Sequence, residues 1–365
     1  VKLWHLLTHT GGFDQIGIAR HVWQLDKPLA DRKALRPSLR EFLQQGNLRR
    51  VSGPGQYFRY DTYGITLAGA VLESVAGRPY AQAMQSVLFE PLAMNRTFVE
   101  VPPELMQDLA TGYGYEGGEY QPMPYEVYVT TPASSIDTTP ADMGRLLAVL
   151  TGDGPDEGRA LSRRAVHATL APQYRPHHDF PGVTHGMFET LAVHEHHPIR
   201  SIGHGGSMLG YHTSLTLLPS LSLGYFIVTN RDPEAGGGAI TIHRRVAEVI
   251  LDTLHARAPS TAWDVPRPDA SVDLTAFIGD YAYGVFCHTC EADEFARGGW
   301  RRGALEQVRI DCGGLLIADR LYYAAAEPGV FVRDDGGQRV FFARDDSGRV
   351  VGFSYASSTD VFERQ

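Results

Sequence analysis

The sequence predicts an α/β protein of the α+β type: an antiparallel sheet flanked by helices, an all-helical part, and a small C-terminal antiparallel β domain. Three observations predict this fold. Helical periods dominate the chain up to Leu150, two apolar runs joined by a turn follow Gly203, and short β-type runs alternate with Gly and Asp turns after Leu274. The 365 residues exceed one ordinary hydrophobic core, so two domains are expected.

The expected helices have recognisable starts and stops. A helix from Leu3 to His9 ends at Thr10-Gly11-Gly12, and one from Tyr63 to Ala76 ends at Gly77-Arg78-Pro79. Thr139-Pro140-Ala141-Asp142 offers a capping hydroxyl, a first-turn proline and an early acid, so a helix through Leu150 is expected to begin there. Further helices are expected at 36–45, 80–89 and 240–255.

Strands and breakers complete the predicted organisation. Thr213–Leu218 and Leu223–Thr229 are apolar runs joined by a Pro-Ser turn, which indicates a hairpin. The stretch from Pro102 to Pro132 is rich in Gly, Pro and Tyr, so we expect an irregular loop that crosses the surface or borders a cleft. Breakers from Ala258 to Ala270 predict a linker. We therefore expect one domain at 1–256, a linker at 257–272 and a small β-barrel-like domain at 273–365.

Composition narrows the classes of partner. Hydrophobic residues make up 43% and charged residues 21% of the chain, as in soluble globular proteins. A formal charge of −9 argues against nucleic acid or an anionic membrane as the main partner. No apolar run approaches the roughly 18 to 20 residues that span a bilayer.

Tyr60 is the first candidate catalytic residue. It lies between a turn and a strongly apolar helix, where a phenol could transfer protons at the mouth of a buried helix. A tyrosine in such a place is more often a half-buried packing residue whose hydroxyl stays wet. The functional interpretation gains weight from Pro54-Gly55 and Phe58, which stand at fixed offsets before the same helix.

The segment His204-Gly205-Gly206-Ser207 is the second candidate. Paired glycines let a substrate approach the backbone closely, and a free N–H there can donate to a developing oxyanion. His204 could supply a cation or a hydrogen bond. The simpler alternative is a glycine turn that precedes a strand.

The segment with Tyr60 followed, roughly 140 residues later, by the segment His204–Ser207 resembles the motif order of the serine β-lactamase and penicillin-binding-protein superfamily, in its class C-like or esterase-like branch. His5-Leu-Leu-Thr-His-Thr-Gly-Gly-Phe13 is similar to the family's LLTHTSG segment, Pro54–Thr62 to the segment with the Tyr-x-Asn motif, and Gly203–Gly210 to the third motif, where Lys-Thr-Gly is often His-x-Gly. Asp108–Tyr113 and Pro132–Met143 also fit. The resemblance covers nearly all of residues 1 to 255 and implies the penicillin-recognising serine-hydrolase fold, while residues from Leu274 resemble the small β-barrel appended to some members.

The resemblance implies acyl transfer, in which a serine attacks a carbonyl and positioned donors hold the oxyanion. Tyr60 matches the tyrosine that moves protons, and His204 matches the cationic position of the third motif. Gly205, Gly206 and Ser207 match the strand whose backbone N–H, after the second glycine, completes the oxyanion hole. Thr62 stands where the family usually has asparagine, so one donor and one acceptor remain and a second donor is lost.

The family's first motif, Ser-x-x-Lys, has no match in this sequence. Ala30 stands three positions before Lys33, Gln24 stands three before Lys27, and Lys2 has too few residues before it. In family members this motif precedes the LLTHTSG segment, and Val1 is not a start methionine. We therefore expect an N-terminal truncation, and we expect this chain alone not to acylate. A mutated motif is the alternative.

Two further clusters invite other interpretations. The histidines from His177-His178 to His194-Glu-His-His197 lack the HExxH spacing and an obvious partner acid, so a solvated loop is expected there and no metal. Cys287 and Cys290 could supply two ligands of a zinc site, but Cys312 is the only other cysteine in the sequence. A pair of thiols or a local disulfide therefore fits better. The segment Gly205–Gly210 is one residue too long for the G-x-S-x-G elbow, which argues against an α/β-hydrolase.

The sequence therefore predicts a serine hydrolase that acts on an amide, β-lactam or ester carbonyl of a small molecule or peptide, without a cofactor. A histidine in the third motif favours an esterase or peptidase over a dedicated lactamase. Two alternatives stay open: a non-catalytic relative that binds peptidoglycan-like peptides or a protein partner, and a metal-dependent hydrolase that uses the histidines. The resemblance implies work outside the cytoplasm, as in the periplasm.

Overall fold

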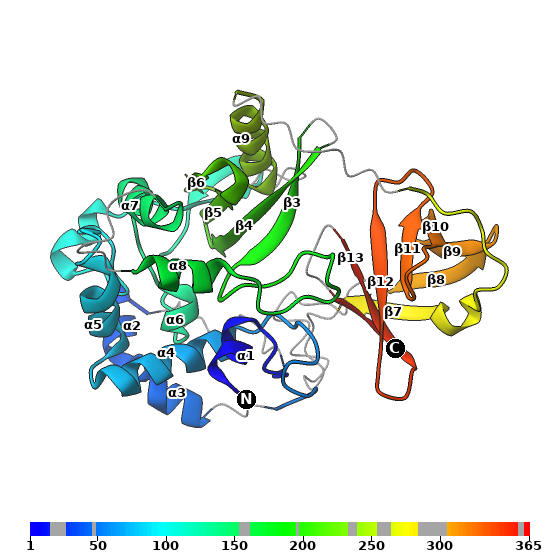
Figure 1. Ribbon diagram of the computed structural model, residues 1–365. Helices are drawn as coiled ribbons and strands as arrows, with labels where there is room; N and C mark the ends of the chain where they lie inside the picture. Colours follow the sequence, from blue (N-terminus) through cyan, green and yellow to red (C-terminus); the bar gives the residue numbers. More distant parts are fainter. Residues whose placement is uncertain are drawn as a thin grey trace.

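The computed structural model describes residues 1–14, 27–45, 49–152, 161–194, 197–232, 239–253, 264–283, 305–356 and 361–365. Their elements form a helical and sheet part and a closed β-barrel, which lie beside each other (Figure 1). Within these residues, no helix is long and apolar enough to cross a membrane.

The central sheet has four antiparallel strands in the order β3-β4-β5-β6. Their bounds are Phe188–His194 (β3), His197–Met208 (β4), Tyr211–Leu218 (β5) and Leu223–Thr229 (β6). The predicted hairpin of β5 and β6 is confirmed. The predicted start of the strand region after Gly203 is wrong, because β3 precedes this residue and β4 contains it. The segment His204–Ser207 therefore lies inside a strand and is not a turn before one.

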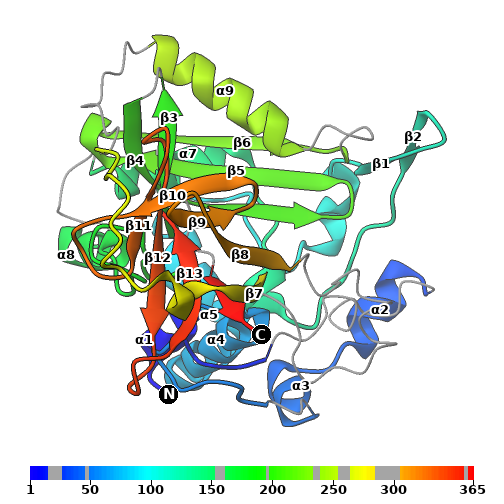
Figure 2. The same cartoon turned by 90° about the vertical axis from the view of Figure 1, so that its right-hand side faces the viewer.

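Helices cover both faces of this sheet (Figure 2). On one face, α7 (Pro140–Leu150) and α8 (Arg163–Leu170) pack on the strands, with Leu147 and Val166 against Ile202 and Leu217. On the other face, Leu251 of α9 (Ala239–Thr253) packs against Ile199 and Leu218. These two residues lie an odd number of positions along their strands from Ile202 and Leu217, so their side chains point to the opposite face. This alternation follows from the pleat of a strand, which points successive side chains to opposite faces.

The all-helical part surrounds α4, which runs from Thr62 to Ala76 as predicted. Asp61 caps its N-terminus by accepting the N–H groups of Tyr63 and Gly64, and Gly77 ends it with a left-handed φ of 62°. It contacts α1 (Leu3–Leu7), α3 (Leu39–Gln45), α5 (Tyr80–Met84) and α6 (Thr131–Ser134), and the same part contains α2 (Leu29–Leu35). The predicted helix at 80–89 changes to a π-helical turn at Gln85–Phe89.

The stretch between Pro102 and Pro132 is less irregular than predicted. It contains a 3-10 helix at Pro103–Asp108 and a hairpin of β1 (Tyr113–Glu116) and β2 (Glu119–Pro122). Gly117 and Gly118 join these strands with φ values of 61° and 90°, the region that glycine adopts most readily. The Gly-Gly pair between two tyrosine-containing runs was the signal that the sequence interpretation missed.

The second body is an eight-stranded antiparallel barrel, closed by pairing of its last strand with its first. Its strands are β7 (Gly279–Tyr283), β8 (Glu306–Asp311), β9 (Gly314–Ile317), β10 (Arg320–Ala324), β11 (Val330–Arg333), β12 (Arg339–Arg344), β13 (Val350–Tyr355) and β14 (Val361–Arg364). Aromatic rings fill its core, among them Phe331, Phe342 and Phe353. The prediction of a small antiparallel β-barrel in the C-terminal part of the chain is confirmed.

The last barrel strand contacts the other body directly. Val361 packs with Phe58 and Val183 in one buried cluster. Next to it, the guanidinium of Arg59 donates to Glu363 at 2.5 Å, and the Arg59 side chain is only 3% exposed. The segment that leads to Tyr60 therefore rests on the barrel.

Candidate active site

The structure brings together the two sequence segments that carry the candidate residues. The rings of Tyr60 and His204 have centroids 6.2 Å apart, and both rings adjoin Phe188 of β3, at 6.2 Å and 5.0 Å respectively. Tyr60 comes from the loop before α4, and His204 comes from β4. The site therefore lies between the helical part and the sheet.

His9 holds Tyr60 from its other side. The imidazole stacks on the phenol with centroids 4.3 Å apart and an interplanar angle of 26°. The Asp61 N–H donates to His9 Nδ1 at 3.0 Å, and the Arg59 N–H donates to the His9 carbonyl at 2.8 Å. Both neighbours of Tyr60 are thus tied to one residue. His9 belongs to the segment used for the resemblance, but the sequence interpretation did not single it out.

Burial favours the neutral forms of the titratable groups of the site. It lowers the pKa of His9 to about 3, assisted by the nearby His204, and it raises the pKa of Tyr60, with the charge of Asp61 acting in the same direction. The Tyr60 hydroxyl therefore carries its proton at neutral pH. Burial also raises the pKa of the Asp61 carboxyl to about 7, against the two backbone N–H groups that favour its charged form.

His204 has a defined hydrogen-bonding state. Its Nδ1 donates to the Gly205 carbonyl at 2.5 Å, and burial lowers its pKa although this hydrogen bond acts in the opposite direction. A neutral imidazole that donates through Nδ1 presents Nε2 as an acceptor. These observations favour a neutral, hydrogen-bonding role for His204 over the cationic role that was also considered.

Gly205, Gly206 and Ser207 form the end of β4 beyond its pairing with β3. That pairing stops at Phe188 and Gly203, whereas the pairing with β5 continues to Met208. Within the described sheet, the β3-side edge of this segment has no strand partner. An unpaired strand edge presents backbone donors and acceptors that a substrate amide or carbonyl can bind.

Thr62 lies close in sequence to Tyr60 but is buried as the first residue of α4, and its carbonyl accepts the Thr66 hydroxyl at 2.9 Å. The structure places it at the N-terminus of α4. Its predicted contact with substrate stays a prediction.

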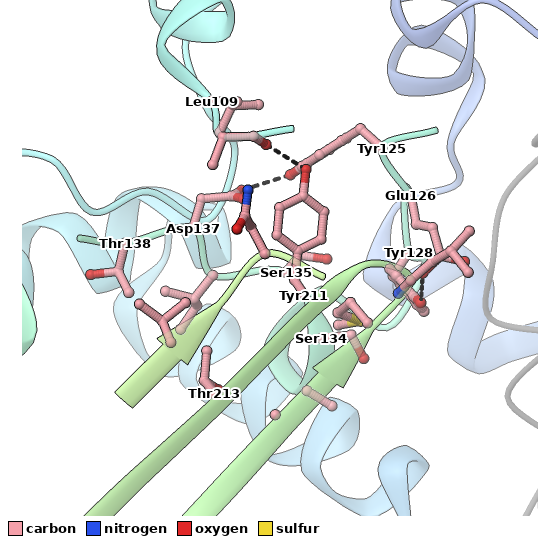
Figure 3. Close-up of a pocket in the computed structure, with 18 of the residues that line it drawn as sticks. Leu109, Tyr125, Glu126, Tyr128, Ser134, Ser135, Asp137, Thr138, Tyr211 and Thr213 are labelled. Atoms are coloured by element: carbon pink, nitrogen blue, oxygen red, sulfur yellow. Dashed lines mark hydrogen bonds between the residues drawn. The ribbon is translucent and has the colours of Figure 1, made fainter. Parts of the chain in front are cut away.

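A pocket of about 390 Å³ adjoins the free end of β4 (Figure 3). Gly206 and Met208 of β4 line it together with Tyr211 and Thr213 of β5, so it shares a wall with the candidate oxyanion strand. The opposite wall comes from the stretch between Leu109 and Thr138. The prediction that the Gly- and Tyr-rich stretch borders a cleft is confirmed.

Two hydrogen-bonded acids shape the far wall of this pocket. Tyr125 donates its hydroxyl to Asp137 at 2.7 Å, and Glu126 accepts the Tyr128 hydroxyl at 2.5 Å and the Leu209 N–H at 3.1 Å (Figure 3). Two of these contacts join positions well apart in the sequence, since Tyr125 lies 12 positions before Asp137 and Glu126 lies 83 before Leu209. The sequence interpretation missed them, since no local motif marks a tyrosine whose partner is set by the tertiary fold.

The prediction that the histidine stretch forms a solvated loop is wrong for His177. This residue is buried, and its Nε2 donates to Glu327 of the barrel at 2.8 Å, so a partner acid does exist. His178, Asp179 and Glu327 bring further ligand-type atoms within 4.8 Å. However, the Asp179 N–H donates to His177 Nδ1 at 3.3 Å, which places the ring proton on Nε2, the nitrogen that would have to bind a metal.

Arg339 adds to the argument against a metal at this cluster. Its guanidinium lies 3.6 Å from Asp179 and 3.8 Å from Glu327, so it already neutralises both carboxylates. We interpret the cluster as a hydrogen-bonded contact between the two bodies. Cys287, Cys290, Glu195 and His196 lie outside the described residues, and the described Cys312 is an exposed free thiol.

Comparison with known proteins identifies the family of the first body. A family model described as "Beta-lactamase" matches residues 1–249. A human protein described as "Putative beta-lactamase-like 1" is 29% identical over 180 residues, which cover 49% of this chain and 35% of that protein. A protein from Escherichia coli (strain K12) described as "Beta-lactamase" is 33% identical over 113 residues, 31% of this chain and 26% of that protein. The matches thus span about a third or less of these relatives.

Solved structures share the fold. A class C beta lactamase from Rhodobacter sphaeroides aligns with a TM-score of 0.52 at 19% identity, covering 70% of this chain and 73% of that one. An octameric penicillin-binding protein homologue from Pyrococcus abyssi aligns with a TM-score of 0.55 at 18% identity, covering 100% of this chain and 77% of that one. The second alignment includes the barrel. The fold is therefore class C β-lactamase-like, with an eight-stranded barrel after it.

Proposed function

The chain belongs to the beta-lactamase family of serine hydrolases, and from this premise we propose that it binds the acyl part of an ester or amide substrate and carries the proton-transfer tyrosine of an acyl-enzyme mechanism. One observation carries the proposal. Tyr60 and His204, far apart in the sequence, lie with ring centroids 6.2 Å apart beside an unpaired strand edge.

Each group has a role in the proposed reaction. The strand edge from Gly205 to Ser207 binds the substrate backbone, and the Ser207 N–H donates to the oxyanion that forms at the attacked carbonyl. Tyr60 is protonated, so it is suited to give its proton to the leaving group and to regain it from the attacking water. His9 and Phe188 keep the phenol between them in position.

The neutral state of His204 bears on the substrate class. A β-lactam presents a carboxylate, which binds best to a cation, whereas Nε2 of His204 is an acceptor for an N–H or O–H group. We propose that the substrate is an ester or a peptide amide with a hydrogen-bond donor near the attacked carbonyl. The adjoining pocket, with mostly apolar side chains and a volume of about 390 Å³, is of a size that suits a small side chain or acyl group.

Whether the protein has a serine nucleophile can be tested by reading the coding sequence upstream of the Val1 codon. Residues 1–365 contain no Ser-x-x-Lys, the motif that carries the acylated serine in this family. An in-frame Ser-x-x-Lys shortly upstream of the Val1 codon would support the enzyme. A start codon with no such motif before Val1 would favour the alternative, a non-catalytic relative that binds peptides, which the threonine at position 62 also favours.

Replacing Tyr60 with phenylalanine tests the proposed proton carrier. In the protein expressed from its complete reading frame, we expect kcat/KM for a p-nitrophenyl ester and for a D-amino-acid anilide to fall by about 100-fold or more, because the proton carrier is lost. KM should change little, since the ring that stacks on His9 is retained.

Tyr80→Phe is the matched control for this experiment. It removes a hydroxyl from a buried tyrosine in the core of the helical part, away from His204. This variant should keep the activity of the parent. Equal activity of the Tyr60→Phe variant and the parent would refute the role of Tyr60, and a preference for a cephalosporin over the ester would refute the assigned substrate class.

A further inference from the structure

A second polar constellation lies at the turn end of β4 and β5, where Ser207 of β4, His212 of β5 and Asp232, which follows β6, are connected in series. The Ser207 hydroxyl is 2.9 Å from His212 Nδ1, and His212 Nε2 is 2.8 Å from an oxygen of Asp232. Ser207 and His212 are direct cross-strand partners on β4 and β5. Their side chains therefore share one face of the sheet, and the short distances follow from the register.

The direction of each hydrogen bond can be assigned. Asp232 accepts the Gly210 N–H at 3.0 Å through the same oxygen that faces His212, so the carboxylate is held in place by the turn between β4 and β5. A carboxylate beside Nε2 keeps the ring proton on that nitrogen. Nδ1 is then left as the acceptor for the Ser207 hydroxyl. The three side chains therefore follow the order of a serine nucleophile, its general base and an acid that orients the base, with the two ring nitrogens exchanged relative to the Ser-His-Asp triad, in which Nε2 faces the serine.

This constellation is separate from the site of Tyr60 and His204. Successive residues of a strand point to opposite faces, so Ser207 faces away from the side of Gly206, which lines the pocket. The proposed function uses the Ser207 backbone N–H and makes no use of its side chain.

Exposure allows the serine to react. Ser207 is exposed, while the side chains of His212 and Asp232 are 15% and 28% exposed. A further hydroxyl stands beside them, because Thr229 is the cross-strand partner of His212 on β6. Its oxygen is buried and has no hydrogen-bond partner among the described residues. The row from Ser207 to Thr229 thus offers an accessible nucleophile and an unused polar group.

We propose that Ser207, His212 and Asp232 form a second reactive-serine site, which accepts acyl or phosphonyl groups from small activated esters on the face of β4 opposite Tyr60. With an ester, Ser207 Oγ bonds to the carbonyl carbon and its proton moves to His212 Nδ1. The bond from that carbon to the leaving oxygen then breaks, and the departing alkoxide takes the proton from His212. The products are acyl-Ser207 and an alcohol.

The test uses a biotin-linked fluorophosphonate on the folded 365-residue chain, followed by proteolysis and mass spectrometry. Attack by Ser207 forms a phosphorus–oxygen bond, releases fluoride and passes the hydroxyl proton to His212, so the peptide that contains Ser207 gains the mass of the probe less that of HF. We expect this serine to react at least about 100-fold faster than Ser220, an exposed serine of the β5–β6 turn that serves as the internal control. This measurement on the unaltered chain needs no variant to fold.

Three variants then separate a reactive site from a structural hydrogen-bond row. Ser207→Ala should remove the label, and His212→Gln should slow it by about 100-fold because the base is lost. Asp232→Asn should also slow it, since an amide donor can reverse the tautomer and cover Nδ1 with a proton. Circular dichroism checks that each variant is folded.

The outcomes distinguish this inference from the proposed function. If Ser207 stays unlabelled, or reacts no faster than Ser220, the second site is refuted even when the complete protein hydrolyses esters in a Tyr60-dependent way. If Ser207 is labelled rapidly while Tyr60→Phe leaves hydrolysis unchanged, only the proposed function is refuted.

Discussion

At the scale of single residues, the surroundings of Tyr60 show how a site is positioned by groups that do not react. His9 is neutral because of burial, and it contacts both the ring of Tyr60 and the backbone on either side of it. Asp61 caps α4 while Tyr60, its neighbour, faces the site. A phenol next to a helix cap has little freedom to move, since the cap fixes the following backbone.

Asp61 gives a prediction for the dependence of stability on pH. Its pKa is raised to about 7 in the folded chain, against about 3.9 in an unfolded chain, so between pH 4 and 7 the folded state holds a proton that the unfolded state lacks. Stability from this group is therefore lost as the pH rises through that window. In Asp61→Asn we expect this loss, of at most about 1.4 kcal/mol per pH unit, to disappear. Urea denaturation from pH 4 to 8 measures it.

Asp273→Asn is the control, because Asp273 also accepts a backbone N–H near a helix start but is exposed and has a lowered pKa. Its stabilising effect should be lost as the pH falls below about 4, the opposite direction. An Asp61→Asn variant whose stability has the same pH dependence as the parent would contradict the assignment.

At the scale of elements, α4 and α6 approach each other through a glycine. A Cβ atom at Gly69 would overlap the ring of Pro132, so the two helices can pack only because this position has no side chain. Pro132 begins the run to Thr138, each residue of which lines the pocket. The approach of these helices therefore sets one wall of the site.

Two alanine substitutions in helices should act in opposite directions. Gly69→Ala should lower the free energy of unfolding by about 1 to 3 kcal/mol, because the added methyl group overpacks the contact with Pro132. Gly144→Ala in α7 should raise it by up to about 1 kcal/mol, because nothing lies within 4 Å of that position and alanine favours a helix. Urea denaturation compares them, and equal effects would contradict the described packing.

Local signals account for the elements that the sequence predicted well. The end of α4 at Gly77 and the start of α7 at Thr139 depend on residues within one turn, and Thr139 accepts the Asp142 N–H as expected. By contrast, β4 carries glycines and polar residues that weaken a strand pattern, and it is stabilised by its neighbours in the sheet.

The candidate site was predictable only in part for the same reason. Tyr60 and His204 stand in recognisable segments, whereas the contact of Tyr125 with Asp137 and that of Ser207 with His212 depend on where the fold places each partner. Glu327 was hidden from the sequence interpretation because it lies 150 positions from His177. No local pattern reports a partner at that separation.

At the scale of the whole molecule, the barrel supports the segment that carries Tyr60. Glu363→Gln keeps the shape of the side chain but removes the charge that faces the buried guanidinium of Arg59. We expect a loss of about 2 kcal/mol in the stability of the first body, because hydrogen bonds to charged groups are worth about that much. Calorimetry should show a lower melting temperature for that body and an unchanged one for the barrel.

Glu306→Gln on β8 is the matched control for this contact and should leave both transitions in place. If Glu363→Gln behaves as this control does, the ion pair does not couple the two bodies. If both transitions shift together, the two bodies unfold as one cooperative unit.

The contact between Arg59 and Glu363 also has a consequence for biosynthesis. The two residues are 304 positions apart, so a ribosome adding about 5 to 20 residues per second delivers Glu363 roughly 15 to 60 s after Arg59. During that interval, Phe58 lacks Val361 and the arginine lacks its carboxylate. The segment that leads to Tyr60 therefore lacks these contacts in the nascent chain until β14 has been translated, and this interval is when a chaperone or a protease would meet it.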